Sequence, residues 1–338
     1  MNLQNDGNRL YIVTGAAGHL GSAVLRCLLK SDEEIRGLIL PDESPAVADP
    51  RITYYSGDVR NQESLKKIFS GTQGRDVILI HTAALISIAE KAPPELYDVN
   101  VNGTKNVLRL CMEYGVKRMV HVSSVHAIPE LPQGGIIKEV SSFSASAVKG
   151  GYAKTKAEAA QAVLDAVKEG LDAVIVFPSG ILGPYDMGRN HLIQMIREYM
   201  AGKLPACVKG GYDFVDVRDV ADGCRRAACY GLKGEGYILS GHYSGIRELL
   251  TMAGQSSGKK AVPVLPLPIA RAAVPLIGLY AKISHKRPLY TSYSLHTLSS
   301  NSTFSNKKAV EMLGYSSRRL EETVADTVDW IKKTVRQQ

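Results

Sequence analysis

Two side chains in the middle of the sequence have the types and spacing of a proton-transfer pair. Tyr152 precedes Lys156 by four residues. In a helix this spacing puts both side chains on one face, whereas Lys154 faces elsewhere. The unperturbed pKa of tyrosine is about 10, so a phenol needs a stabilising neighbour to exchange protons near neutral pH. We expect the ammonium group of Lys156 to lower the pKa of Tyr152.

A pair of serines could bind the oxygen atom to which such a proton moves. Ser123 and Ser124 follow an apolar run over 119–122 that predicts a strand. Open parallel sheets bind their ligands at the carboxyl ends of strands. We predict that Ser124 polarises the substrate oxygen, with Ser123 as the alternative. His126 lies close by, and a lone histidine in a loop is more often a surface or substrate-lining residue than a base.

A glycine-rich turn near the N-terminus predicts a dinucleotide site. The pattern G-x-x-G-x-x-G stands between an apolar run over 10–14 and a helical pattern over 19–30. Such a turn lets the backbone approach a pyrophosphate, which the N–H groups at the helix start can bind. The predicted cofactor contacts here are Gly15, Ala17, Gly18, His19, Leu20 and Gly21. The ring of His19 is also suited to packing within the loop.

The end of the second predicted strand indicates which dinucleotide is bound. Asp42 stands there, and no lysine or arginine follows until Arg51. A carboxylate in this place binds the hydroxyls of the adenine ribose and repels a 2′-phosphate. We therefore predict NAD, with NADP possible if Arg36 folds inward. The alternative for Asp42 is a turn residue.

Two further loops are expected beside the cofactor. Asp58 and Val59 follow the third predicted strand and are suited to hold the adenine, although Asp58 could equally cap the helix that begins near Asn61. The fourth predicted strand is followed by small residues, which suit a backbone that passes close to a ligand: Thr82, Ala83 and Ala84. His81 is expected to be structural rather than catalytic.

The order of apolar runs predicts an α/β fold with a Rossmann-type, doubly wound parallel sheet. Runs typical of strands cover residues 10–14, 35–40, 52–55, 77–80, 119–122 and 173–177, separated by helix-like stretches. We predict an NAD(P)-binding domain over 1–177, to which 214–240 returns. Residues 178–338 are expected to form a smaller, mostly helical substrate lobe, with candidate helices over 190–202, 246–253, 269–283, 306–313 and 320–335.

Composition sets limits on partners and compartment. The chain has 338 residues, a net charge of +8 and five scattered cysteines without a metal-ligand spacing. Its basic residues form no stripe, so we predict no nucleic-acid partner, and we predict no metal site. Reduced thiols and a polar N-terminus indicate a cytoplasmic protein.

The apolar segment 264–283 is too short and interrupted to span a bilayer. It fits a helix packed on the lobe, or a contact with a membrane or an apolar substrate.

An ordered set of motifs resembles the extended short-chain dehydrogenase/reductase family, also described as NAD-dependent epimerases and dehydratases. The motifs are Thr14-Gly15-x-x-Gly18-x-x-Gly21, Gly57-Asp58-Val59, His81-x-Ala83-Ala84, Asn100-x-x-Gly103-Thr104, Val122-Ser123-Ser124, Tyr152-x-x-x-Lys156 and Pro178-x-x-Ile181-x-Gly183-Pro184. Within the family, the chain is similar to dihydroflavonol-reductase-like and 3β-hydroxysteroid-dehydrogenase-like members.

The resemblance implies roles for several residues. It implies a catalytic triad of Ser124, Tyr152 and Lys156, in which Lys156 also holds the ribose of the nicotinamide. Asn100 is implied to join their polar network. Pro178 and Ser179 are implied to contact the nicotinamide end of the cofactor. Many members pair as homodimers through two long helices, here about 94–114 and 152–168.

The sequence thus predicts hydride transfer between NAD(P) and a ketone, an aldehyde or a secondary alcohol, with Tyr152 as general acid and base. Apolar residues of the lobe suggest a small-molecule substrate with a hydrophobic part. One alternative is a nucleotide-sugar epimerase that retains its NAD, but Tyr212 stands where such enzymes carry an arginine. Dehydratases place an Asp-Glu pair where this chain has Val125 and His126. A non-catalytic dinucleotide sensor is a third possibility, and it would be expected to lack Tyr152 or Lys156.

Overall fold

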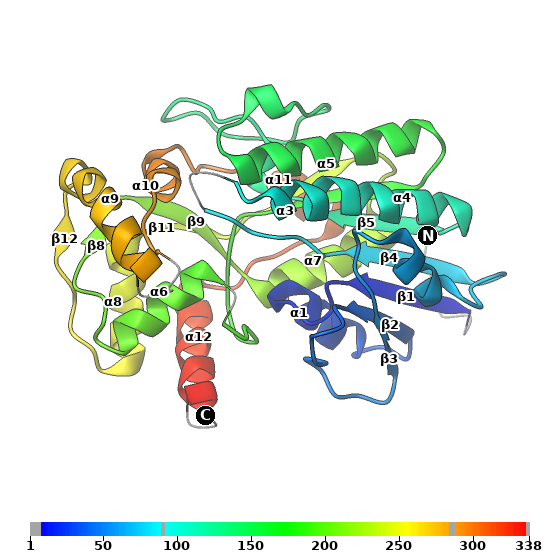
Figure 1. Ribbon diagram of the computed structural model, residues 1–338, viewed down its shortest axis with the longest axis horizontal. Helices are drawn as coiled ribbons and strands as arrows, with labels where there is room; N and C mark the ends of the chain where they lie inside the picture. Colours follow the sequence, from blue (N-terminus) through cyan, green and yellow to red (C-terminus); the bar gives the residue numbers. More distant parts are fainter. Residues whose placement is uncertain (1–7, 89–91, 189, 284–287, 336–338) are drawn as a thin grey trace.

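A seven-stranded parallel sheet forms the centre of the larger part of the molecule (Figure 1). The computed structural model describes residues 8–88, 92–188, 190–283 and 288–335. The strand order is β10-β6-β5-β4-β1-β2-β3. The strands are β1 (Arg9–Thr14), β2 (Glu34–Ile39), β3 (Ile52–Ser56), β4 (Asp76–His81), β5 (Arg118–Val122), β6 (Ala173–Pro178) and β10 (Gly236–Leu239). The predicted doubly wound α/β fold is therefore confirmed.

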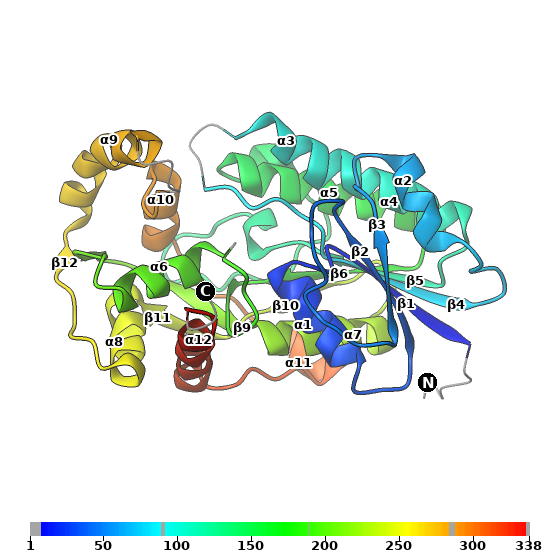
Figure 2. The ribbon, with the colours of Figure 1, turned by 60° about the horizontal axis from the view of Figure 1, so that its bottom comes forward.

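Helices cover both faces of this sheet, which explains why its strands are apolar on both sides (Figures 1 and 2). One face carries α2 (Gln62–Lys66), α3 (Pro94–Tyr97), α4 (Gly103–Glu113) and α5 (Gly151–Lys168). The other carries α1 (His19–Leu28), α7 (Val217–Tyr230) and α11 (Lys307–Leu313). A π-helical turn, Asp98–Asn102, joins α3 to α4. Short 3₁₀ turns lie at Lys67–Phe69, Val125–Ala127 and Ala145–Ala147.

The remaining elements form a smaller lobe beside the carboxyl ends of the central strands (Figure 1). It contains a three-stranded sheet of order β11-β9-β7 and a two-stranded sheet of β12 and β8. These strands are β7 (Gly180–Leu182), β8 (Cys207–Val208), β9 (Gly211–Asp216), β11 (His242–Gly245) and β12 (Val264–Leu265). The lobe helices are α6 (His191–Met200), α8 (Ile246–Ser257), α9 (Leu267–Ile283), α10 (Ser292–Ser299) and α12 (Leu320–Val335).

The segment 214–240 runs between the two parts. Its first residues end β9 in the lobe sheet, whereas α7 packs against α1 under the large sheet. At its end, β10 pairs in parallel with β6 and extends the large sheet. The segment thus connects the lobe sheet to the large sheet.

Helix α9 has one buried and one exposed side. Ala270 is buried in a small cluster with Val208 and Leu295. Ile269 and Leu276 remain 56% and 71% exposed. Within the described part of the chain, no helix is both long and apolar enough to cross a bilayer.

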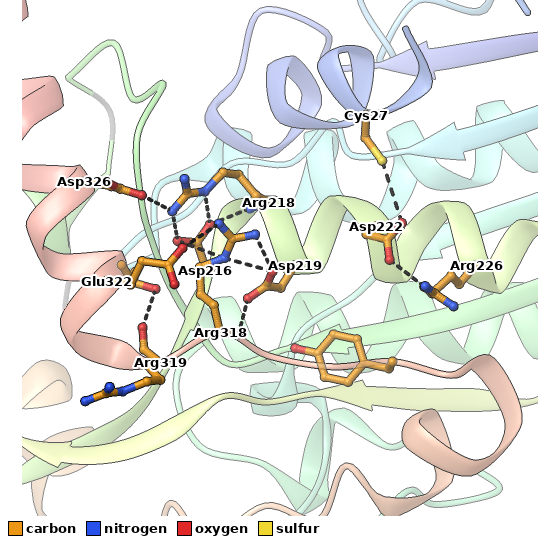
Figure 3. Close-up of polar contacts among 12 residues, drawn as sticks. Cys27, Asp216, Arg218, Asp219, Asp222, Arg226, Arg318, Arg319, Glu322 and Asp326 are labelled. Carbon is orange, nitrogen blue, oxygen red and sulfur yellow. Dashed lines mark hydrogen bonds and ion pairs between the residues drawn. The ribbon is translucent and has the colours of Figure 1, made fainter. Parts of the chain in front are cut away.

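An ion-pair cluster joins α7 to the start of α12 (Figure 3). The side chain of Asp216 is fully buried, accepts from the backbone N–H of Arg218 at the start of α7, and pairs with the Arg218 guanidinium at 2.7 Å. Arg218 also pairs with Asp326 of α12 at 2.7 Å. Arg318 donates to Asp219 through its backbone N–H and its guanidinium, each at 2.7 Å. The cluster therefore ties the C-terminal helix to the central layers.

We predict that Arg318→Met destabilises the protein by about 2–3 kcal/mol. Removing one partner of a buried ion pair costs about 3–5 kcal/mol, and partial exposure of the arginine reduces this figure. Asp219 would lose its charged partner, and Asp216 would lose a guanidinium that lies 3.7 Å away. Denaturant unfolding measures the change. Arg319→Met is the matched control, because Arg319 is 82% exposed and should shift stability by less than about 0.5 kcal/mol. Equal effects of the two substitutions would contradict the prediction.

Candidate active site

Four loops that the sequence singles out follow four adjacent strands of the large sheet. Residues 15–21 follow β1, residues 82–84 follow β4, residues 123–124 follow β5, and residue 179 follows β6. Parallel strands bring these loops to one edge of the sheet. The order reverses between β1 and β4, which is where open α/β sheets bind ligands.

The glycine turn leaves no room for a side chain at Gly15 or Gly21. Gly15 has a φ of +69°, and a Cβ atom there would lie 2.8 Å from the backbone of Ala83. A Cβ atom at Gly21 would lie 2.1 Å from the carbonyl oxygen of Gly15. Gly18 caps α1 without a side-chain hydrogen bond. The N–H groups at the start of α1 can therefore hold an anion such as a pyrophosphate.

The residues between these glycines pack within the protein. The His19 ring lies between the carbonyl of Pro184, 2.9 Å from Nε2, and the amide of Asn190, 3.2 Å from Nδ1. Ala17 and Leu20 pack against the core beneath the large sheet. The ring of His19 thus links the turn to the lobe.

The residues near the expected adenosine end differ in how they are held. Asp42 is exposed in a turn after β2. Arg36 is buried and donates to the carbonyls of Ile68 and Ser70 at 2.9 and 2.7 Å. Its guanidinium is therefore engaged away from a 2′-phosphate beside Asp42.

Asp58 does not cap the helix that follows it. Asn61 is the N-cap of α2, and its side chain accepts from the N–H of Ser64. The helix-cap alternative for Asp58 is therefore wrong. Asp58 instead pairs with Arg60 at 2.6 Å, and this contact lowers the pKa of its carboxyl group. The side chain of Val59 is buried.

The segment Thr82–Ala84 is bonded to the end of β1. The hydroxyl of Thr82 donates to the carbonyl of Thr14 at 2.7 Å, and Ala83 N donates to the Thr14 hydroxyl at 3.3 Å. His81 is buried with its Nδ1 2.7 Å from the same hydroxyl. Burial lowers the pKa of His81 to about 3, so the ring is neutral. These contacts give His81 a structural role, as expected.

The predicted triad comes together at the end of β5 and the first turns of α5. The Ser124 side chain hydrogen-bonds Tyr152. The Ser123 hydroxyl instead faces the carbonyl of Lys156 at 3.5 Å, so the geometry favours Ser124. Lys156 is 4% exposed and its Nζ donates to the carbonyl of Val122 at 2.9 Å.

Burial dominates the electrostatics of this site. Desolvation raises the pKa of Tyr152 to about 12, although the hydrogen bond with Ser124 acts to lower it. Desolvation also lowers the pKa of Lys156 to about 8. The expectation that Lys156 lowers the pKa of Tyr152 is therefore wrong for this arrangement, because Nζ is directed to the Val122 carbonyl. Near neutral pH the phenol is protonated and most of the amine is charged.

Asn100 holds the surroundings of the triad in position. It lies in the π-helical turn, a feature frequent at functional sites. Its side chain accepts from the N–H of Leu85 at 2.8 Å and donates to the carbonyl of Leu85 and the hydroxyl of Thr155 at 3.0 Å. Asn100 thus ties the loop after β4 to the residue before Lys156.

The end of β6 supplies a buried polar corner. Pro178 is the last residue of β6 and pairs with Leu239 of β10. Ser179 is 8% exposed. Burial raises the pKa of nearby Asp213 to about 6, while Ser179 and the N–H of Gly241 act to lower it.

Sequence reasoning named His126 as a surface or substrate-lining residue but missed that it forms an aromatic group facing the triad. The rings of His126 and Tyr152 meet edge to face, with centroids 6.1 Å apart. The hydroxyl of Tyr212 lies 3.0 Å from Nε2 of His126, and that of Tyr293 lies 3.5 Å from Nδ1. Two signals were present in the sequence: His126 close to the serine pair, and Tyr212 in place of an arginine. Nothing in the sequence signalled Tyr293, which comes from α10.

Comparisons with known proteins agree with this geometry. Sterol demethylase protein B from Methylococcus capsulatus is 31% identical over 331 residues, covering 95% of this chain and 98% of that protein. A putative dihydroflavonol 4-reductase from Synechocystis is 30% identical, covering 95% and 94%. The crystal structure of gox2253 superposes with a TM-score of 0.83 at 31% identity, covering 97% and 99%.

A family model adds the last piece of evidence. The model of the NAD dependent epimerase/dehydratase family matches residues 11–239, which include the glycine turn and the tyrosine–lysine pair. The chain therefore belongs to the NAD dependent epimerase/dehydratase family, as its motifs predicted.

Proposed function

We propose that this protein is an NAD-dependent oxidoreductase that transfers a hydride between the nicotinamide and a ketone, an aldehyde or a secondary alcohol. The observation that carries the proposal is the meeting of Ser124, Tyr152 and Lys156 at the end of β5. These three residues lie at the same sheet edge as the N-terminus of α1, which has no side-chain cap.

The residues at this edge fit a dinucleotide. The glycine turn and the start of α1 suit a pyrophosphate, because N–H groups face it and no side chain intervenes. NAD is preferred to NADP, because Asp42 repels a 2′-phosphate and Arg36 is engaged elsewhere. When bound, the nicotinamide gives or accepts the hydride. Lys156 would donate to its ribose, and Pro178 and Ser179 would line its ring.

The protonation states favour reduction near neutral pH. Ser124 would hold the carbonyl oxygen by a hydrogen bond, which stabilises the negative charge that develops there. Tyr152, whose pKa is about 12, would donate its proton to that oxygen. In the reverse direction the phenolate would remove the proton of the alcohol.

Two relatives are named for a dihydroflavonol and for a sterol. Both names denote multi-ring compounds, which supports a substrate with a hydrophobic part for this chain.

We also propose a homodimer through the two long helical stretches, about 94–114 with α3 and α4 and about 152–168 in α5. Tyr97 and Met112 are 42% and 40% exposed on this side of the molecule.

Epimerisation is the alternative, and it is less well supported. Tyr212 is 7% exposed and bonded to His126, so an uncharged group stands where a diphosphate would need a cation. A dinucleotide sensor is less well supported still, because Tyr152 and Lys156 are both present.

The decisive experiment identifies cofactor and reaction together. Mass spectrometry of the purified protein would show any retained nucleotide. Consumption of NADH and NADPH would then be measured with ketones, aldehydes and nucleotide sugars. Net consumption of added NADH supports the reductase, whereas tightly held NAD without net turnover supports the epimerase. Absence of affinity for either dinucleotide would contradict both.

Tyr152→Phe should reduce turnover by about two orders of magnitude or more, the usual effect of losing a general acid. Binding of NADH should stay nearly unchanged, because only the hydroxyl group is lost and the aromatic ring remains. Steady-state kinetics and fluorescence titration with NADH measure the two effects. Tyr230→Phe, at the exposed end of α7, is the matched control. Turnover close to that of the native protein would contradict the role of Tyr152.

Lys156→Met should weaken NADH binding and lower turnover together. The substitution preserves most of the buried volume but removes the charge and the donor to the ribose. Titration with NADH and the rate at saturating cofactor separate the two effects. A loss confined to thermal stability would indicate that Lys156 is only structural.

The rate of the reduction should fall in alkaline solution. Burial lowers the pKa of Lys156 to about 8, so its charge is present at lower pH and is lost as the pH rises. Tyr152, with a pKa raised to about 12, stays protonated in this range. We expect kcat/KM for reduction to be level near neutrality and to fall as the pH passes about 8. A level profile up to about pH 9.5 would contradict this assignment.

A further inference from the structure

His126, Tyr212 and Tyr293, here called the His126 cluster, are fixed relative to the triad. His126 lies in the 3₁₀ turn Val125–Ala127, and its N–H donates to the hydroxyl of Ser124 at 3.3 Å. The hydroxyl that bonds Tyr152 therefore also fixes the backbone of His126. The imidazole ring meets the Tyr152 ring edge to face, with centroids 6.1 Å apart.

The imidazole is held by two phenols from different elements. Tyr212, from β9, stacks on it with an interplanar angle of 13° and contacts Nε2 at 3.0 Å. Tyr293, from α10, approaches Nδ1 at 3.5 Å, near the limit for a hydrogen bond. The contact with Tyr293 is thus the weaker of the two.

The cluster carries no charge near neutral pH. Burial lowers the pKa of His126 to about 4, outweighing the opposing effect of Glu130. Burial also raises the pKa of Tyr212 and of Tyr293. A neutral imidazole has one donor and one acceptor. The phenol that accepts its N–H therefore keeps its own proton to donate elsewhere.

Tyr293 is held over the site by backbone packing. A Cβ atom at Gly150 would lie 2.2 Å from the Tyr293 ring, so the ring rests on the turn that begins α5. Thr291 caps α10 and its hydroxyl donates to the carbonyl of Ile88 at 2.7 Å. The Tyr293 hydroxyl, which also hydrogen-bonds the Thr297 side chain, is therefore positioned beside the turn that begins α5.

We propose that the His126 cluster binds a second oxygen atom of the substrate, a hydroxyl or carbonyl group on the carbon next to the one that reacts. This inference rests on the proposed oxidoreductase function. The neutral cluster suits an uncharged oxygen rather than a phosphate or carboxylate. The substrate class is therefore α-hydroxyketones, α-diketones and the matching diols.

The test compares two ketones that differ only in the second oxygen, cyclohexanone and 2-hydroxycyclohexanone. The native protein should have a kcat/KM about tenfold higher for the hydroxyketone, the scale of one net hydrogen bond. Tyr293→Phe and His126→Phe should each remove this preference, chiefly through KM, while leaving cyclohexanone reduction within about threefold. His126→Gln retains a donor and an acceptor and should recover part of the preference. Tyr230→Phe is the control, and NADH binding with thermal midpoints checks that each variant is folded.

Two kinds of failure can be told apart. Equal kcat/KM values for the two ketones in the native protein, or a preference that survives in both phenylalanine variants, would overturn the subsite. Reduction of neither ketone would count against the proposed reaction on these substrates. Calorimetry would then compare trans-1,2-cyclohexanediol with cyclohexanol on the protein saturated with NADH. Tighter diol binding that is lost in Tyr293→Phe supports the subsite, and equal binding of the two alcohols overturns it.

Discussion

Desolvation of a tyrosine and a lysine at the end of β5 is the constraint on which the rest of the site depends. A buried ammonium group is costly unless polar partners compensate for lost water. The Val122 carbonyl supplies such a partner for Lys156, and the Ser124 hydroxyl does so for Tyr152. Both partners come from the last residue of one strand and the loop that follows. The position of α5 against β5 therefore sets the protonation states of the pair.

Small side chains on α5 permit this close approach. The helix faces the sheet with alanines, among them Ala153, Ala157 and Ala160, which are at most 2% exposed. Beneath the lysine, the neighbouring strands β4 and β5 carry His81 and His121 in register. Burial, and after it the charge of Lys156, lowers the pKa of both rings, which are therefore neutral. The buried polar residues under the site thus add no competing charge.

The sequence predicted the strands of the large sheet and the elements that carry Ser124, Tyr152 and Lys156 better than it predicted the elements of the lobe. Strands buried on both faces give continuous apolar runs, such as residues 10–14 and 173–177, so their type and order could be read directly. The short strands of the lobe carry too few residues for a recognisable period, and α10 has little amphipathic character. The pKa of Tyr152 was misjudged for another reason. Spacing of four residues predicts that two side chains share a helix face, but it gives no information about desolvation or about the carbonyl that Lys156 meets.

The lobe contributes to the site through strand β9, which joins two features that the sequence left separate. Tyr212 lies near its beginning and stacks on His126, whereas Asp216 ends it and caps α7 within the ion-pair cluster (Figure 3). Because β9 spans only the six residues Gly211–Asp216, an anchor at one end restricts the position of the other. The cluster with Arg318 thus does more than attach α12. It also fixes the strand that carries Tyr212, whose ring stacks on His126 beside Tyr152.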